Sequence, residues 1–286
     1  MADDLQRQDL QRHNAELERH KEAEKAEEPQ KGYETILEQE IQSGVTELER
    51  PAAGLFLSAL SAGLDVSFSL LVIAVVTHLT EGYFSPPVER LLLANAYSVG
   101  FLFVVLGRSE LFTEHTTLAV LPVLDRRASL TQLGRLWGIV YVANLLGAIV
   151  FAGFFSFIAP RLGIAEPRTF GHIASEVVSH PWTVILLSGV LAGWLMGLLS
   201  WLVAASRDTI SQVFMVWLVT FVIGLAHLHH SVAGSAEVLA GVFSGQGATA
   251  GDFLHFLSAS TLGNAIGGIV FVAVIKYGHV RGLKKQ

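Results

Sequence analysis

The sequence predicts an all-α membrane protein of six transmembrane helices, arranged as two inverted three-helix repeats in which the second and fifth helices are broken. The 286 residues are 51% hydrophobic and 15% charged, with a mean hydropathy of +0.50, whereas soluble domains carry about 25% charged residues. Six apolar segments are long enough to cross a bilayer, and two of them carry polar interruptions at matching places. The absence of cysteine excludes disulfide scaffolds and thiolate chemistry, and the net charge of −6 gives no general reason to bind nucleic acid.

The first fifty residues differ from the rest of the chain in charge. They hold 7 basic and 14 acidic residues, while residues 51–286 hold 12 and 11. Residues 1–31 are charge-dense and are expected to be solvated. Residues 33–49 carry an apolar stripe at helical spacing, which predicts an amphipathic helix with this stripe buried: Tyr33, Leu37, Ile41, Val45 and Leu48. We therefore divide the chain into an acidic cytoplasmic tail, 1–50, and a six-helix transmembrane domain, 51–286.

Six segments meet the length that a bilayer requires. A hydrocarbon core of about 30 Å needs about 20 apolar residues in a helix. No ten-residue stretch alternates apolar and polar residues as a membrane β-strand would, so helices are expected. The six predicted spans are Ala52–Leu79, Leu91–Leu124, Leu130–Ile158, Trp182–Ala205, Ile210–Val242 and Phe253–Tyr277.

The basic residues of the connecting segments predict the orientation. If the N-terminus is inside, eight basic residues lie on the inner side and three on the outer side, which favours cytoplasmic termini in a multi-pass protein of the inner (plasma) membrane. The outer connections near residues 85–87 and 160–181 are expected to be turn-rich loops. The inner set is Arg126, Arg127, Arg135, Arg207, Lys276, Arg281, Lys284 and Lys285, and the outer set is Arg90, Arg161 and Arg168.

The second and fifth spans are each interrupted by polar residues. Residues 107–117 read Gly-Arg-Ser-Glu-Leu-Phe-Thr-Glu-His-Thr-Thr, and residues 227–235 read His-Leu-His-His-Ser-Val-Ala-Gly-Ser. Each break lies in the second of three spans, so residues 52–158 and 182–277 are interpreted as inverted copies. Broken helices in corresponding positions indicate a substrate site at the bilayer midplane, where free N–H groups at half-helix ends favour an anion. The alternative is that each break is a packing kink.

Three motifs in these spans resemble the formate/nitrite transporter family. Residues 110–113 resemble the family's acidic residue followed by Leu-Phe-Thr. Residues 230–233, His-Ser-Val-Ala, are similar to its His-Ser-Ile-Ala. Residues 262–268, Leu-Gly-Asn-Ala-Ile-Gly-Gly, are similar to its Leu-Gly-Asn-x-x-Gly-Gly. The motifs occur in order and in the matching spans, so the resemblance covers most of residues 52–277.

The resemblance implies an aquaporin-like fold and a homopentamer in which each protomer has its own pore for small monovalent anions. If the family's roles apply at the matching positions, Leu111, Phe112 and Thr113 would form the loop beside the pore. His230 would be the central histidine, within hydrogen-bond reach of that loop and most plausibly of Thr113. Asn264 would be a polar group contributed by the sixth helix.

The chain departs from the family pattern at several places, which indicates a divergent branch. The fourth-helix lysine of the family is missing, since residues 182–206 contain no Lys or Arg. His229 stands where the family has Glu, Gly234 where it has Asn, Glu114 and His115 where it has small residues, and Arg108 is additional.

The charged residues of the breaks admit two interpretations. Arg108, Glu110 and Glu114 would form an internal ion-pair network, because buried charges need partners. Alternatively, Arg108 supplies the cation lost with the missing lysine and attracts anions into a vestibule. His229 and Glu237 are further candidates for vestibule charges, with Glu237 either paired with Arg108 or facing the vestibule.

The sequence thus predicts a channel or transporter for small monovalent anions of the formate or nitrite type, passive or proton-coupled, and not an enzyme. It is expected to need no cofactor or metal, and its partners would be the anions, protons, membrane lipid and other copies of the chain. His230 would lend a proton or a hydrogen bond at the centre, with His227 as a rival position. Two alternatives remain: a membrane metalloprotein or enzyme using His227, His229 and His230 with a glutamate, and a scaffold or sensor whose acidic tail recruits partners.

Overall fold

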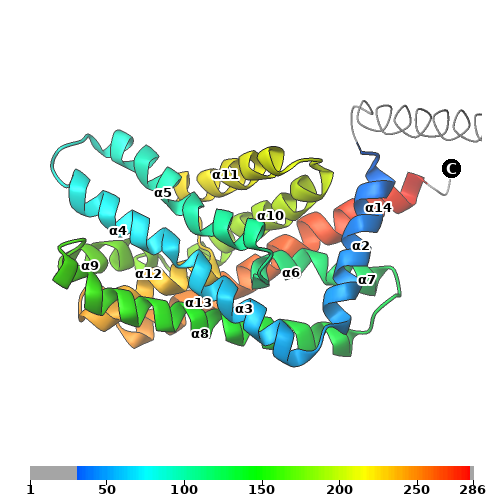
Figure 1. Ribbon diagram of the computed structural model, residues 1–286, viewed down its shortest axis with the longest axis horizontal. Helices are drawn as coiled ribbons and strands as arrows, with labels where there is room; N and C mark the ends of the chain where they lie inside the picture. The colour runs from blue at the N-terminus through cyan, green and yellow to red at the C-terminus, as the bar shows by residue number, and fades with distance from the viewer. Residues whose placement is uncertain (1–30, 284–286) are drawn as a thin grey trace, which may run out of the picture.

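The computed structural model describes residues 31–283, in which all regular structure is helical. Five apolar helices of this part are long enough to cross a membrane, and they run side by side along the long axis of the molecule (Figure 1). They are Ala52–Thr80 (α3, Ala52–Val66, and α4, Phe68–Thr80), α5 (Pro86–Gly107), α8 (Leu130–Leu162), α10 (Trp182–Ala205) and Ala250–Gly282. The predicted fifth span is divided between two shorter apolar helices, α11 (Thr209–Leu225) and α12 (Ser231–Ser244).

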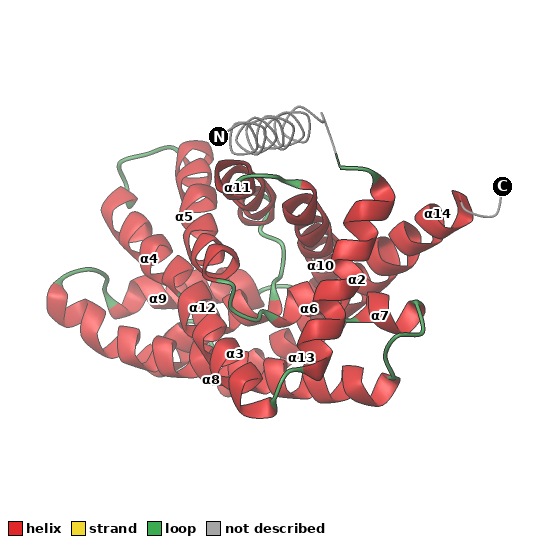
Figure 2. Cartoon of the chain, turned by 45° about the vertical axis from the view of Figure 1, so that its right-hand side comes forward, coloured by secondary structure: helices red, strands yellow, loops and turns green. Residues whose placement is uncertain are grey.

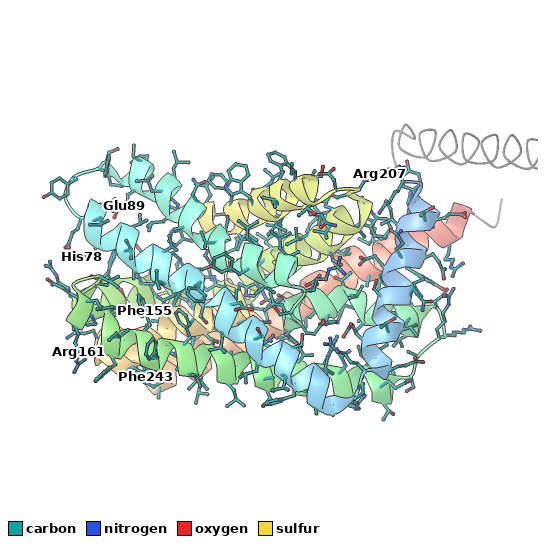
Figure 3. The ribbon with its side chains drawn as sticks, in the orientation of Figure 1. His78, Glu89, Phe155, Arg161, Arg207 and Phe243 are labelled. Atoms are coloured by element: carbon teal, nitrogen blue, oxygen red, sulfur yellow. The ribbon has the colours of Figure 1, made fainter. Side chains whose placement is uncertain are left out.

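Polar and apolar residues are distributed as a membrane-spanning bundle requires. Figure 3 places His78 and Arg161 at one end of the bundle and Arg207 at the other, with Phe155 and Phe243 further in. Large apolar side chains are exposed on the sides of the bundle, among them Phe154 and Leu187. Apolar sides between charged ends suit a hydrocarbon layer between two aqueous faces.

Two breaks interrupt the bundle in its interior (Figure 2). After α5, Arg108 adopts a left-handed conformation with φ 54° and ψ 42°, and the chain re-enters helix as α6 (Phe112–Leu118) and α7 (Val120–Leu124). After α11, His227 has φ 49°, and α12 then begins. Left-handed residues reverse the chain direction locally, which ends a helix without a glycine at some cost in strain.

The second span begins five residues earlier than its hydropathy predicts. Pro86 and Pro87 occupy the first turn of α5, where a missing N–H costs nothing because that donor has no partner inside the helix. The polar residues of this first turn hide the start of the helix from a hydropathy argument.

The last span is not a uniform α-helix. It consists of α13 (Ala250–Ile266), a π-helical segment η1 (Gly267–Val274) and α14 (Ile275–Leu283). The Thr117 hydroxyl of α6 donates a hydrogen bond to the carbonyl of Gly268 at 3.0 Å, and a Cβ at Gly268 would come within 2.2 Å of Thr116 Oγ1. Because α6 lies so close, its Thr117 hydroxyl satisfies a carbonyl of the last span at the point where that span changes from α-helix to π-helix.

The connection over residues 160–181 was expected to be a turn-rich loop, and this expectation is wrong. It contains an amphipathic helix, α9 (Pro167–Val178), with Pro167 in its first turn. Phe170, Ile173 and Ala174 are buried against the bundle. Prolines at both ends of the segment mask a helix only three turns long, and α9 closes one side of the cavity described below.

Helix α2 (Tyr33–Glu49) crosses the end of the bundle that also carries α7 and α14 (Figure 1, blue). Leu37, Ile41 and Leu48 are buried, and Val45 is half-buried. Tyr33 is 61% exposed and was wrongly placed in the buried stripe: it lies in the first turn of α2, where its ring meets only the edge of the His279 ring on α14, 5.6 Å between centroids.

The segment preceding α2 is tied to the bundle at Lys31. The Lys31 ammonium donates hydrogen bonds to the carbonyls of Ala204, at 2.7 Å, and Ser206, at 3.2 Å. A cation at the carboxyl end of a helix satisfies its last carbonyls and its dipole. The predicted solvated character of residues 1–30 concerns residues outside the described part of the chain.

Glu40 makes the docking of α2 sensitive to pH. Its carboxylate accepts a hydrogen bond from the Ser200 hydroxyl at 2.6 Å, and burial raises the pKa of Glu40 from 4.5 to about 7. The docked helix therefore holds this proton more tightly than the free helix, so the contribution to docking is complete below about pH 4.5 and is lost as pH rises through about 7. The difference is on the order of 3 kcal/mol.

We expect amide hydrogen exchange in residues 36–48 to accelerate when pH rises from about 6 to about 8, after correction for the intrinsic rate. Glu40→Gln should remove this acceleration, and Glu49→Gln, at an exposed position of the same helix, should leave it unchanged. Equal corrected exchange at both pH values in the wild type would contradict the prediction.

Candidate functional site

A cavity of about 580 Å³ enters the bundle beside α9 and ends at the break of the fifth span. Its titratable side chains come from five parts of the fold: Arg90 and Tyr97 from α5, His172 and Glu176 from α9, His180 from the segment before α10, His227, His229 and His230 from the break, and Glu237 from α12. In the predicted orientation this cavity opens on the outer side of the membrane. It is a path by which a small solute can reach the interior of a single chain.

His230 lies at the inner end of this cavity and is only 1% exposed. It is the N-cap of α12, where its Nδ1 accepts a hydrogen bond from the Ala233 N–H at 3.2 Å. Its Nε2 lies 2.7 Å from Thr113 Oγ1, as the sequence predicts. Since Nδ1 uses its lone pair, the ring hydrogen is on Nε2 and is donated to Thr113. The imidazole therefore joins the two breaks of one chain.

Asn264 lies on the last span and fixes the break of the fifth span through hydrogen bonds. Its Oδ1 accepts a hydrogen bond from the Ser231 N–H at 2.8 Å, and its Nδ2 donates to the carbonyls of Gly189 and His229, each at 2.9 Å. The whole amide is thus used within the protein, and Asn264 is not part of the cavity wall. Its role in this arrangement is to position the loop that carries His230.

Asn144 repeats this arrangement at the second-span break. Its Oδ1 accepts from the Phe112 N–H at 2.8 Å, and its Nδ2 donates to Ala59 O at 2.7 Å and Glu110 O at 2.9 Å. Asn144 is not among the residues that the sequence motifs indicated. The sequence does contain a signal for Asn144, because the two halves of the chain share a pattern around it. Residues 143–148 and 263–268 both read small-Asn-x-x-Gly-small.

Glycines let the two asparagine-bearing helices approach their neighbours. A Cβ at Gly63 would come within 2.2 Å of the Asn144 carbonyl oxygen, and a Cβ at Gly193 within 2.1 Å of that of Asn264. Neither distance is possible for a real side chain, so only glycine allows each asparagine to reach across to the break.

The loop of the second span lies beyond His230 and does not line the cavity. Leu111 and Thr113 are fully buried, and Phe112 packs against the rings of Trp137 and Tyr141, at 5.9 and 4.8 Å between centroids. Apolar side chains therefore lie beyond the inner end of the cavity, with Thr113 as the polar contact to His230.

An ion-pair network exists in the second-span break, but its cation was predicted wrongly. Glu110 pairs with Arg50 at 2.8 Å and with His115 at 2.5 Å, and Arg50 also reaches Glu47 at 3.0 Å. Within residues 31–283, Arg108 forms no ion pair with Glu110, Glu114 or Glu237 and its side chain is exposed. Its left-handed backbone at the end of α5 directs it away from the carboxylates.

His229, which stands at the family's glutamate position, connects three elements. Its Nε2 lies 3.0 Å from the Val177 carbonyl of α9 and so must donate its hydrogen. Its Nδ1 lies 2.8 Å from the Ser188 hydroxyl of α10, which also accepts from the His229 N–H at 3.1 Å. This side chain fixes the break to α9 and α10 rather than presenting a charge to the cavity.

The three histidines of the break do not converge as metal ligands in the described part of the chain. Both ring nitrogens of His229 and of His230 are occupied by protein groups, and His227 Nδ1 lies 3.9 Å from Glu176 at the exposed rim. Within the described residues, no three His, Asp or Glu side chains converge as metal ligands. The geometry does not support the alternative of a metalloprotein built on this cluster.

At Gly234, where the resembling family has asparagine, the Phe256 ring occupies the space of a side chain. A Cβ at Gly234 would come within 2.5 Å of the fully buried Phe256 ring. We expect Gly234→Asn to destabilise the fold by about 1–3 kcal/mol through overpacking, measured as a lower midpoint of thermal unfolding in detergent.

Adding Phe256→Leu should restore most of the stability lost in Gly234→Asn, because it removes the clashing ring. Gly251→Asn is the control, since its nearest neighbour lies 3.6 Å away, and it should have little effect. An unfolding midpoint of Gly234→Asn equal to that of the wild type would show that Phe256 does not exclude a side chain.

Comparison with known proteins agrees with this geometry. Residues 34–278 match the model of the formate/nitrite transporter family. The inner membrane protein YfdC of Escherichia coli is 32% identical over 243 residues, which are 84% of this chain and 76% of YfdC. An FNT family ion channel shares the fold with a TM-score of 0.77 at 22% identity, covering 86% of this chain and 98% of that one. A pentameric formate channel with formate bound has a TM-score of 0.64 at 25% identity, covering 80% and 98%.

The fold and the cavity define an integral membrane protein of the transporter and channel class. The chain belongs to the formate/nitrite transporter family, because the family match extends over most of its length.

Proposed function

We propose that this chain forms a channel or transporter for small monovalent anions of weak acids, with one pore in each protomer of a homopentamer. The observation that carries the proposal is the cavity that ends at His230, where both broken spans of one chain meet through the His230–Thr113 hydrogen bond. The likeness to a pentameric formate channel supports both the pentamer and the small anion.

The proposed architecture has six spans in two inverted repeats, with α11 and α12 together forming the fifth span and both termini in the cytoplasm. Asn144 and Asn264 support it, since each accepts a hydrogen bond from the first residue of a half-helix and donates two to loop and helix carbonyls. Two copies of one hydrogen-bond pattern are expected when both halves descend from one unit.

In the proposed mechanism, an anion enters the outer cavity past the Arg90 guanidinium and reaches His230. The imidazole there is fixed by Thr113 and by the Ala233 N–H, while Phe101, edge-on to His230 at 5.1 Å, and the buried Leu111 and Phe112 exclude water. A bare anion is costly among apolar side chains, and the neutral acid crosses them more easily. The substrate is therefore expected to be the anion of a weak acid.

A flux panel in proteoliposomes tests the proposal. Reconstituted full-length protein should move formate, nitrite, acetate, lactate or hydrosulfide faster than protein-free vesicles, with His230→Phe at the background rate. Background flux of all five anions in the wild type would overturn the proposed function.

A further inference from the structure

The proposed mechanism needs a proton in the outer cavity, and His230 is poorly placed to supply it. Protonating its Nδ1 would break the hydrogen bond from the Ala233 N–H that begins α12. Its Nε2 hydrogen is already donated to Thr113. The imidazole is therefore a fixed neutral group, and a proton transfer at either nitrogen costs a hydrogen bond of the fold.

The other titratable side chains of the cavity wall also have partners, with two exceptions. Arg90 donates to Leu225 O, His229 is held at both nitrogens, and Glu176 has His172 and His227 as neighbours at 3.6 and 3.9 Å. Among the titratable side chains that line the cavity in the described residues, only the Glu237 carboxyl and the Tyr97 hydroxyl have no hydrogen bond or ion pair. A tyrosine hydroxyl is too weak an acid to give up a proton at neutral pH.

Glu237 lies on the same face of α12 as His230, seven residues along the helix toward the cavity mouth. It is 8% exposed, and no cation is paired with it among residues 31–283. A buried carboxylate without a partner cation is strongly disfavoured. The carboxyl is therefore expected to be held in its protonated form, which can donate a hydrogen bond.

We propose that Glu237 delivers the proton to the incoming weak-acid anion in the outer cavity. This inference rests on the proposed function. The Glu237 O–H first hydrogen-bonds to an oxygen of the anion and then transfers its proton to it, which leaves the Glu237 carboxylate and the neutral acid. The neutral acid passes His230 and the apolar side chains and ionises in the water beyond. Water at the outer mouth reprotonates Glu237, so one proton moves with each anion.

The surroundings of Glu237 favour this cycle. Arg90 and Tyr97 face the cavity from α5, His172 and Glu176 from α9, and His180 from the segment before α10. The Glu176 carboxylate lines the same cavity, and like charges disfavour each other, so the protonated form of Glu237 is favoured. Helices α4 and α13 contribute Ile73, Thr77 and Phe256, none of which titrates.

The test is the pH profile of labelled formate uptake into proteoliposomes, for the full chain, between about pH 5 and about pH 8 outside. If Glu237 supplies the proton, wild-type uptake has a plateau at low pH, where the anion is protonated inside the cavity. In Glu237→Gln only preformed formic acid can cross, so uptake should fall at least about tenfold and then drop about tenfold per pH unit. Glu166→Gln, at an exposed carboxyl outside the cavity, should keep the wild-type profile.

A second measurement is independent of transport. The infrared difference spectrum between wild type and Glu237→Gln at neutral pH should contain the carbonyl band of a protonated carboxylic acid. If Glu237→Gln does not assemble, Glu237→Asp takes its place. It keeps a carboxyl group, so its formate uptake should show the wild-type pH profile with a lower plateau. Nitrate, the anion of a strong acid, should not be taken up by the wild type at the rate of formate.

These measurements distinguish a failure of the role of Glu237 from a failure of the proposed anion transport. An unchanged pH profile in Glu237→Gln, or the absence of the infrared band, overturns the role of Glu237 while the anion pathway stands. No formate uptake by the wild type overturns the proposed function and the proton delivery with it.

Discussion

Replacing His230 by phenylalanine is expected to reduce formate flux to the rate of protein-free vesicles. The larger ring has no polar atom for Thr113 or for the Ala233 N–H, and it would occupy the inner end of the cavity. His230→Asn should behave differently. Asparagine is a good N-cap, but its amide is too short to reach Thr113 as His230 Nε2 does. The protein should therefore assemble with flux lowered by about ten- to a hundredfold.

The control for His230 is its neighbour in sequence. His227→Asn changes an exposed rim residue and should alter flux less than about threefold. Proteoliposome uptake at a fixed pH, normalised to incorporated protein, measures all three variants. If His230→Asn keeps the wild-type rate while His227→Asn loses it, the central histidine has been assigned to the wrong position.

Replacing Asn264 by leucine is expected to cause the largest loss of stability. The substitution leaves the Ser231 N–H and the His229 carbonyl without a partner in a buried site, and it removes the second hydrogen bond of the Gly189 carbonyl in α10. Each unsatisfied group costs about 1–3 kcal/mol, so the total is several kcal/mol. Asn144→Leu should have a similar effect, because Asn144 makes the same three kinds of hydrogen bond.

Asn95→Leu is the matched control for these two variants. Asn95 is exposed and bonds to Leu91 O and to the Trp217 indole, so its loss should cost about 1 kcal/mol or less. Thermal unfolding of the purified proteins in one detergent ranks the three. If Asn264→Leu and Asn95→Leu unfold at the same temperature, Asn264 does not hold the break.

The sequence predicted features that depend on local composition. Long apolar segments, the polar stretches that interrupt them and the motif around His230 all lie within short windows of residues, and the structure joins His230 to Thr113 as the motif suggested. The start of α5 and the whole of α9 were missed because proline and polar residues in a first turn lower hydropathy without preventing a helix.

Features that depend on distant partners could not be predicted in the same way. The cation of Glu110 is Arg50, sixty residues away in the chain, whereas Arg108 had seemed the natural partner from its position. The π-helical segment after Ile266 packs against α6, and such a contact leaves no periodic signal in the sequence. The wall of the cavity, including Tyr97 and Ser188, is formed by helices that meet only in the folded chain.

The central claim is that each chain contains a complete anion pathway, and mixed assemblies test it most directly. Wild-type and His230→Phe subunits are combined in varied ratios and reconstituted, and formate uptake is measured per assembly. If each protomer has its own pore, uptake falls in proportion to the fraction of variant subunits, to about half at an equal mixture. If five subunits share one pore that each variant blocks, an equal mixture retains only about one thirtieth of the uptake, and this result would contradict the account.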